Sequence, residues 1–196
     1  MTPELARVIA LARRRGACVR VVDQAAWDAA VRVRIVDRAG EKHALLHEDW
    51  HEAPFSHMSL AIDERDRVVY LLDAHAEDNE AAGSVIHDLA HLHASKRESV
   101  RRSNEYGWMA WEIAVAREAR VRGAWDLAMK DYGLGSAPAG LEHLDGMDWS
   151  EVTRSEQLAV IADRMKAARK RGIVDARGRA VWCRLPRLLS CEKAEI

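Results

Sequence analysis

The stretch of this sequence that most restricts its fold is Val85–His93, which reads VIHDLAHLH. Its apolar residues recur at the spacing of an α-helix that buries one face. His87 and His91 are four residues apart, so on such a helix both imidazoles lie on the same face, one turn from each other. Two imidazoles at this spacing can bind one tetrahedral zinc ion, and Asp88 follows the first of them. The sequence therefore predicts a helix that carries part of a metal site.

A zinc ion held by two histidines needs a third protein ligand, and two glutamates on the next predicted helix are candidates. Glu105 and Glu112 are seven residues apart, about two turns, so they share a face of that helix. An antiparallel return of the chain would place Glu105 beside His91 and Glu112 nearer His87. We expect Glu105 to be the ligand, with Glu112 as the alternative. His93 is expected to face away from the site.

A second stretch, His47–His51, reads HEDWH and matches the H-E-x-x-H pattern of zinc peptidases letter for letter. It follows a predicted strand, and Pro54 comes three residues later, which leaves little room for a two-turn helix. A chain with nine histidines also meets such a pattern more often by chance. We therefore expect His47 and His51 to lie in a loop and place the metal on the other motif.

The acid after the first histidine is the candidate general base. In H-E-x-x-H sites a glutamate there accepts a proton from water whose pKa zinc has lowered to about 7. Asp88 has one methylene less than glutamate, so its carboxylate falls short by roughly 1.5 Å. A misplacement of that size can lower a rate by about a hundredfold. The sequence thus predicts a slow hydrolase, one that uses a shifted water, or a protein that keeps the metal without catalysis.

The motif and the order of its flanking parts resemble the ImmA/IrrE family of zinc metallopeptidases. That family carries H-E-x-x-H and then a glutamate in an E-x-E-A-N-x-F-A pattern; here His87–His91 reads HDLAH and Glu105–Trp111 reads EYGWMAW. The resemblance covers residues 58–120. It implies a protein or peptide substrate, since family members commonly come from mobile elements and cleave or regulate transcriptional repressors. The site residues that it implies are the zinc ligands His87, His91 and Glu105, with Asp88 as the base.

The remaining patterns predict an α+β fold with a small, mostly antiparallel sheet packed on a helical core. A Gly- and Pro-containing loop from residue 135 is the best domain boundary. It would separate a metallopeptidase-like domain, residues 1–134, from an extension of residues 135–196 that forms a helix and a β-hairpin. The elements expected before the histidine helix are a helix from Thr2 to Gly16, a strand Cys18–Val22, a short helix 23–30, a hairpin 31–46, and an antiparallel pair Ser59–Ile62 and Val68–Leu72. Those expected after it are helices 103–123, 124–134 and 150–171 and a hairpin 172–186.

The charge of the chain is balanced overall, with 30 Lys and Arg against 31 Asp and Glu, and so indicates no particular partner. Nine of the basic residues, however, lie between Arg164 and Arg187. On a helix followed by a hairpin they would form a basic patch for nucleic-acid phosphates, and its binding would weaken with salt. The plainer alternative is a solvated basic helix face. A further alternative is a catalytically silent family member that binds a protein or DNA through this extension.

The cysteines and the apolar runs indicate the compartment. Cys18, Cys183 and Cys191 have neither metal nor redox spacing, and three thiols leave one unpaired in any disulfide scheme. No apolar run approaches the roughly 18–20 residues of a membrane span, and residues 1–4 do not open a signal peptide. We therefore expect a cytoplasmic protein without a membrane partner.

Overall fold

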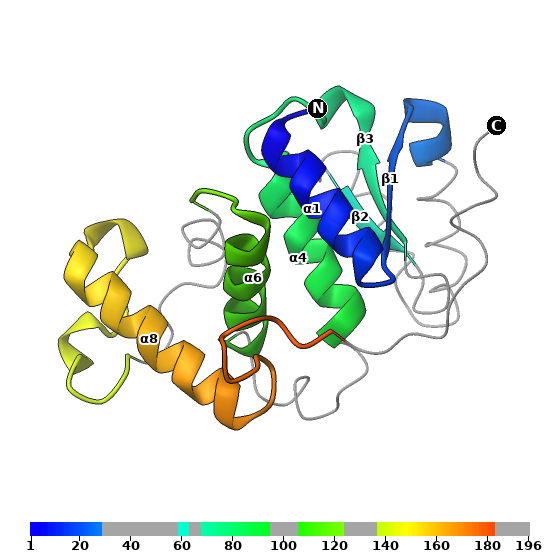
Figure 1. Ribbon diagram of the computed structural model, residues 1–196. Helices are drawn as coiled ribbons and strands as arrows, with labels where there is room; N and C mark the ends of the chain where they lie inside the picture. The colour runs from blue at the N-terminus through cyan, green and yellow to red at the C-terminus, as the bar shows by residue number, and fades with distance from the viewer. Residues whose placement is uncertain (29–58, 63–67, 95–105, 124–136, 183–196) are drawn as a thin grey trace, which may run out of the picture. The chain divides into compact units, whose positions relative to one another are not determined.

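The computed structural model describes residues 1–28, 59–62, 68–94, 106–123 and 137–182; of residues 59–62, 91–94 and 106–108 it describes the backbone alone. The chain divides into two compact units, residues 1–89 with 185–196 and residues 90–184. The described part is α+β, and helices predominate in it (Figure 1). None of the helices in these ranges is long and apolar enough to cross a membrane.

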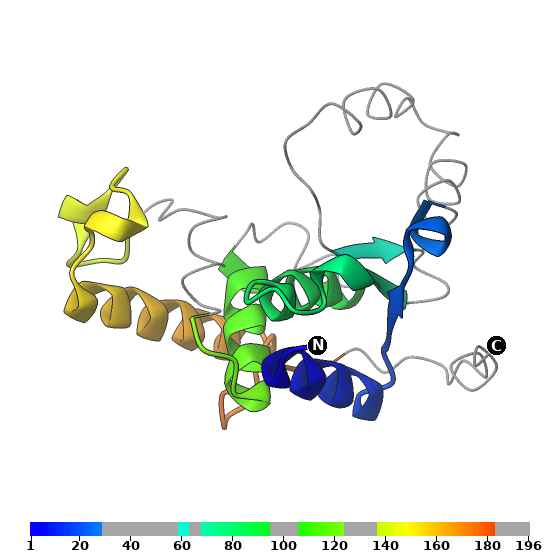
Figure 2. The same ribbon diagram turned by 90° about the horizontal axis from the view of Figure 1, so that it is seen from above.

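Helix α1 (Pro3–Arg14) begins and ends where its sequence predicts. The Thr2 hydroxyl accepts a hydrogen bond from the backbone N–H of Leu5 at 3.2 Å, and a proline takes the first helical position. The chain turns after the helix at Gly16, whose φ of +81° is left-handed. It then enters strand β1 (Cys18–Val22), which lies beside α1 (Figures 1 and 2). The helix is buried along one stripe, at Leu5, Val8, Leu11 and Ala12.

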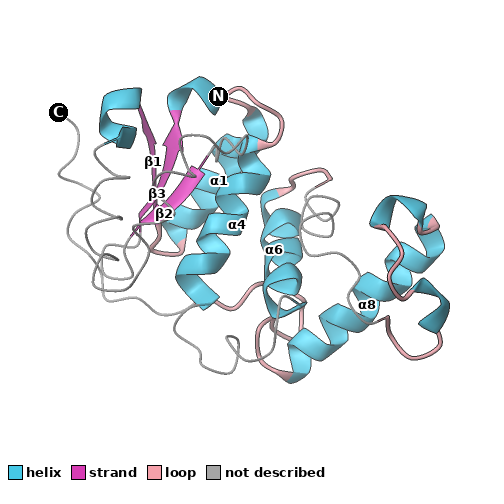
Figure 3. Ribbon diagram, turned by 180° about the vertical axis from the view of Figure 1, so that it is seen from behind, coloured by secondary structure: helices cyan, strands magenta, loops and turns pink. Residues whose placement is uncertain are grey.

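The sheet of the first unit is mixed, so the prediction of a mostly antiparallel sheet is wrong. Strand β3 (Val68–Leu72) lies between β1 and β2 (Ser59–Ile62), as Figure 3 shows. The pairing of β2 with β3 is antiparallel, as predicted. The pairing of β1 with β3 is parallel over five residues, with Cys18 opposite Val68.

The direction in which β1 pairs could not be read from its residues. Side chains alternate between the two faces of a strand in parallel and antiparallel sheets alike, so Cys18–Val22 has the same pattern in both. The direction depends on the connection, because a parallel neighbour needs a crossover of about a dozen residues or more. Residues 23–67 separate β1 from β3 and are long enough for one. The buried side chains of β3 suit a central strand: Val68, Val69 and Leu71 are at most 4 % exposed.

In the second unit, helix α6 (Tyr106–Ala119) is buried around its circumference. Residues 109–116 are all buried, so this part of the helix exposes no face. The helix ends at Ala119 rather than at the predicted Gly123, because Arg120 adopts a left-handed φ of 56°. The helical spacing of its apolar residues Trp108, Trp111, Val115 and Ala119 predicts that this stripe is buried. The side chain of Trp108 lies outside the described part. The other members, Trp111, Val115 and Ala119, are buried as predicted.

Helix α8 (Arg154–Lys170) begins four residues after the predicted Ser150, because the side chain of Thr153 caps it. Ser150 lies instead in a short 3-10 turn, η3 (Trp149–Glu151). A second such turn, η2 (Glu142–Leu144), precedes it, and both gather at the start of α8 (yellow in Figure 2).

The helical spacing of Leu158, Ile161, Met165 and Ala168 predicts one buried face on α8, and the observed face differs from it at a single position. Ile161, Met165 and Ala168 are buried, as their spacing predicts. Leu158 was expected beside them but is 51 % exposed, and Val160 is fully buried instead. The periodicity identified the face correctly and misplaced only its first turn.

Candidate functional site

Helix α4 (Ala81–Ala94) carries the histidines and the acid of the predicted metal site. The predicted helix is confirmed, and it begins at Ala81, four residues before Val85. His87 and His91 both lie within it, so their backbone positions are one turn apart, about 6 Å along the helix axis. Asp88 lies in the same turn as His87. The helical spacing that the motif requires is therefore present in the backbone.

The apolar neighbours of His87 anchor this part of α4 in the core. Val85, Ile86, Leu89 and Ala90 are each at most 1 % exposed. His87 and Asp88, in contrast, are half-buried. An imidazole and a carboxylate therefore lie at the boundary between core and surface, where a solvent molecule can reach them. The side chain of His91 lies outside the described part.

Of the two candidates for the third ligand, Glu105 and Glu112, the structure describes the surroundings of Glu112 alone. Glu105 lies outside the described residues, directly before α6 begins at Tyr106. Glu112 lies within α6 and is 4 % exposed, the one buried charged side chain of the described part. Its neighbours Trp111 and Ile113 are buried as well. Burying a carboxylate is costly, on the order of several kcal/mol, unless cations or hydrogen-bond donors offset the loss of water. Glu112 is therefore an internal carboxylate of the second unit.

The other predicted metal-binding residues lie beyond what the structure describes. The HEDWH stretch, with His47, Glu48 and His51, falls in residues 29–58, and the side chain of His93 is not among those described. The described side chains include no group of three or more His, Cys, Asp or Glu that could hold a metal ion. Among the predicted zinc ligands His87, His91 and Glu105, the structure describes only the side chain of His87.

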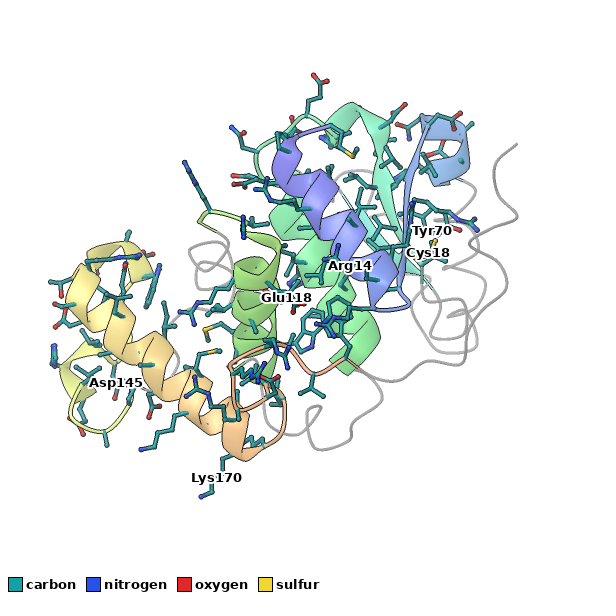
Figure 4. The ribbon with its side chains drawn as sticks, viewed as in Figure 1. Arg14, Cys18, Tyr70, Glu118, Asp145 and Lys170 are labelled. Carbon is teal, nitrogen blue, oxygen red and sulfur yellow. The ribbon has the colours of Figure 1, made fainter. Side chains whose placement is uncertain are left out.

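A second group of candidate residues forms a basic surface at the C-terminal end of α8 and in the turn that follows. Of the predicted cations between residues 164 and 187, Arg164 is half-buried, and Arg184 and Arg187 lie outside the described part. Figure 4 shows Lys170 extending away from the ribbon at the end of the helix. The exposed cations, which we call the basic surface, are Lys166, Arg169, Lys170, Arg171, Arg177 and Arg179.

Asp175 organises the turn beside this surface, a role that the sequence analysis does not predict. Its Oδ1 accepts hydrogen bonds from the backbone N–H groups of Arg177 at 2.9 Å and Arg179 at 2.8 Å, and its Oδ2 accepts one from Nε of Arg179 at 2.8 Å. These bonds, chiefly the backbone bond from Arg179, hold the pKa of Asp175 below its usual range. The predicted hairpin is present here as one antiparallel bridge between Val174 and Ala180.

No protein-family model, curated protein or solved structure matches this chain. The assignment of a function therefore depends on its own residues and their spacing. Two groups carry chemistry: the histidine helix α4 and the basic surface.

Proposed function

We propose that this chain is a zinc-dependent hydrolase of the metallopeptidase type, in which His87, His91 and Glu105 hold the metal and Asp88 is the general base. The observation that supports it best is α4. It is one unbroken helix in which both histidines occupy positions one turn apart. His87 and Asp88 are also half-buried on a helix whose apolar side is fully buried.

The residues of this set fit zinc in their chemistry. Two imidazole nitrogens with one carboxylate are a ligand set of catalytic zinc sites, whereas Ca²⁺ and Mg²⁺ prefer oxygen ligands throughout. Zinc bound by these residues would lower the pKa of a water molecule towards about 7 and polarise the carbonyl of a peptide bond. The buried residues on either side of His87 hold this part of the helix in the core.

Asp88 would move the proton in the reaction. Its carboxylate accepts a proton from the attacking water, whose oxygen bonds to the peptide carbonyl carbon. When the C–N bond breaks, Asp88 returns that proton to the nitrogen of the leaving amine. The shorter side chain makes a slow enzyme the expected case. The proposed substrate is a protein or peptide, such as a regulatory protein of a mobile element.

The zinc content of the purified protein tests this proposal directly. We expect about one zinc per chain in protein never exposed to chelator, measured by elemental analysis. His87→Ala and His91→Ala should lose the metal, while His47→Ala, the matched control in the other motif, should keep it. Loss of metal in Glu105→Gln with retention in Glu112→Gln would identify the third ligand, and the reverse would assign it to Glu112. Protein without any transition metal would refute the proposal.

A second candidate function is a catalytically weak or inactive regulator that binds a protein or DNA through the extension of residues 135–196. The observation that favours it is Asp88, which is too short for the glutamate position of the motif. One zinc per chain without any peptide hydrolysis would support it over the enzyme. Both candidates suit a cytoplasmic protein, since Cys18 is a free thiol.

A further inference from the structure

The basic surface is continuous across two segments, the last turns of α8 and the turn after it. The backbone N–H of Ile173 donates to the carbonyl of Ala168 at 2.9 Å, which folds the chain back against the helix. At Gly178 the turn approaches so closely that an added Cβ would lie 3.4 Å from Nη2 of Arg169 and 3.7 Å from Cε of Met165. The guanidinium of Arg169 on the helix therefore lies against the turn that carries Arg177.

These cations are presented by residues 160–182, which we call the module. It is packed and anchored within the second unit. Ile173, Val174 and Ala180 are buried under the turn. The backbone N–H of Val181 donates to the carbonyl of Ile173 at 3.0 Å, and the indole N–H of Trp111 on α6 donates to the carbonyl of Val181 at 3.2 Å. Hydrogen bonds thus connect the segments before and after the turn to α8 and to α6.

The charge of this module is strongly positive. Residues 160–182 hold seven Lys or Arg and two Asp. One of the two acids, Asp175, pairs with Arg179 at 2.8 Å, which leaves Asp163 as the exposed acid of the module. The negative end of the helix dipole accounts for Arg169 and Lys170 in the last turn. It does not account for Lys166, one turn earlier, or for Arg177 beyond the helix.

We infer that the basic surface binds the phosphate backbone of a nucleic-acid duplex, independently of base sequence. Phosphates are recognised by clustered Lys and Arg, and Arg adds two-pronged hydrogen bonding to their oxygens. Lys166 and Lys170 share one helix face, as residues four apart do, so they can follow a backbone together. Residues 160–182 contain one aromatic side chain, that of Trp182, which is half-buried and packs against Trp111, whereas single strands are typically held by stacking on exposed aromatic rings. A duplex is therefore the better match.

Fluorescence anisotropy of a labelled DNA duplex, about two helical turns long, tests this inference on the full chain. With about four phosphates neutralised, the slope of log K against log salt should be near −4, a loss of about a hundredfold in affinity between 50 and 200 mM salt. The double variant Lys170→Gln, Arg177→Gln should reduce that slope by about two. The control Arg13→Gln, Arg14→Gln removes the same charge from exposed positions on α1 and should leave it unchanged.

Three results would overturn the inference. One is an absence of binding at 50 mM salt, and another is an equal loss in both double variants, which would indicate attraction by net charge alone. The third is retention by vesicles of phosphatidylcholine and phosphatidylserine as strong as retention by DNA, since the surface would then recognise anions of any kind. Binding should be the same with and without chelator, because the metal proposed for α4 has no part in it.

Discussion

Asp175 and Arg179 form an ion pair across the turn after α8. Oδ2 of Asp175 lies 2.8 Å from both Nε and Nη2 of Arg179, and Oδ1 accepts the backbone N–H of the same residue at 2.8 Å. The backbone N–H of Arg177 donates to that Oδ1 as well. The shape of the turn therefore depends on an oxygen acceptor at residue 175. The ion pair with the Arg179 side chain depends in addition on the negative charge of Asp175.

This division predicts different effects for two substitutions at one position. Asp175→Asn keeps an oxygen for the backbone bonds but loses the charge, so Arg179 is released for phosphate. We expect tighter duplex binding and a salt slope steeper by about one unit. Asp175→Ala removes the acceptor and should bind more weakly than the Asn variant, although both lack the acid. Equal affinities of the two variants in the anisotropy assay would show that Asp175 does not shape the turn.

The capping box of α8 predicts a loss of stability in acid. Glu156 accepts hydrogen bonds from the backbone N–H of Thr153 at 3.0 Å, from the Thr153 hydroxyl, and from Nε2 of His143 at 2.7 Å. These bonds, chiefly that of the Thr153 side chain, hold the pKa of Glu156 below its ordinary 4.5. A carboxyl with a lowered folded pKa stabilises the protein above its unfolded pKa, and this contribution disappears as the pH falls through the folded value. The free energy of unfolding should therefore decline below a pH of about 4.5.

Urea unfolding followed by circular dichroism, at pH values of about 7 and 3.5, measures this decline. Glu156→Gln is the matched control, because glutamine keeps a capping-box acceptor and cannot ionise. It should decline less with acid than the natural chain. Thr153→Ala should be less stable at neutral pH, by about 1 kcal/mol. An identical pH dependence of the natural chain and the Gln variant would contradict the assignment.

The fold could be predicted from sequence wherever the signal is local. The cap of α1 at Thr2 and the apolar periodicity of α4 each lie within one element, and both predictions are confirmed. The start of α8 was misplaced because Ser150 is also a good capping residue, and only the bonds of Thr153 distinguish them. The parallel pairing of β1 was missed because it depends on a partner far along the chain.

In the candidate sites, too, the parts that could be predicted are those with a signal in the local sequence. The spacing of His87 and His91 is a property of one helix, so it could be predicted, whereas the third ligand requires the return of the chain and stays a prediction. The role of Asp175 had a local signal that was overlooked. Asp175–Arg179, which reads DARGR between the apolar pairs Ile173-Val174 and Ala180-Val181, is a turn sequence, in which an Asp side chain typically accepts backbone N–H groups two residues on.

The contact of Trp111 with the segment after the turn predicts a measurable contribution to stability. Its indole N–H donates to the carbonyl of Val181, and its ring meets that of Trp182 edge to face, with centroids 4.8 Å apart. Trp111→Phe keeps a ring but loses the donor, so we expect the free energy of unfolding to fall by about 1–2 kcal/mol. Leu158→Ala, at an exposed position of α8, is the control and should change little. A Trp111 variant as stable as the control would show that this contact does not anchor the turn.

The length of the side chain at residue 88 gives the sharpest test of the proposed hydrolase. Asp88 follows His87 on α4, where the H-E-x-x-H pattern has glutamate. Asp88→Glu extends the carboxylate by one methylene, roughly 1.5 Å, and so restores the reach that the pattern provides. We expect hydrolysis of a fluorescent casein to rise, by as much as about a hundredfold. Residue 88 is half-buried, so part of its side chain faces solvent.

Asp88→Asn completes this test, because it keeps the size of the side chain and removes the base. It should retain zinc and lose hydrolysis, which separates the proton transfer from the binding of the metal. If the Glu variant is as inactive as the Asn variant while both hold one zinc per chain, the shortness of Asp88 is not what limits the reaction. The chain would then use its metal to stabilise α4, and its function would lie in binding a partner. If the Glu variant alone gains activity, the natural aspartate accounts for a slow enzyme.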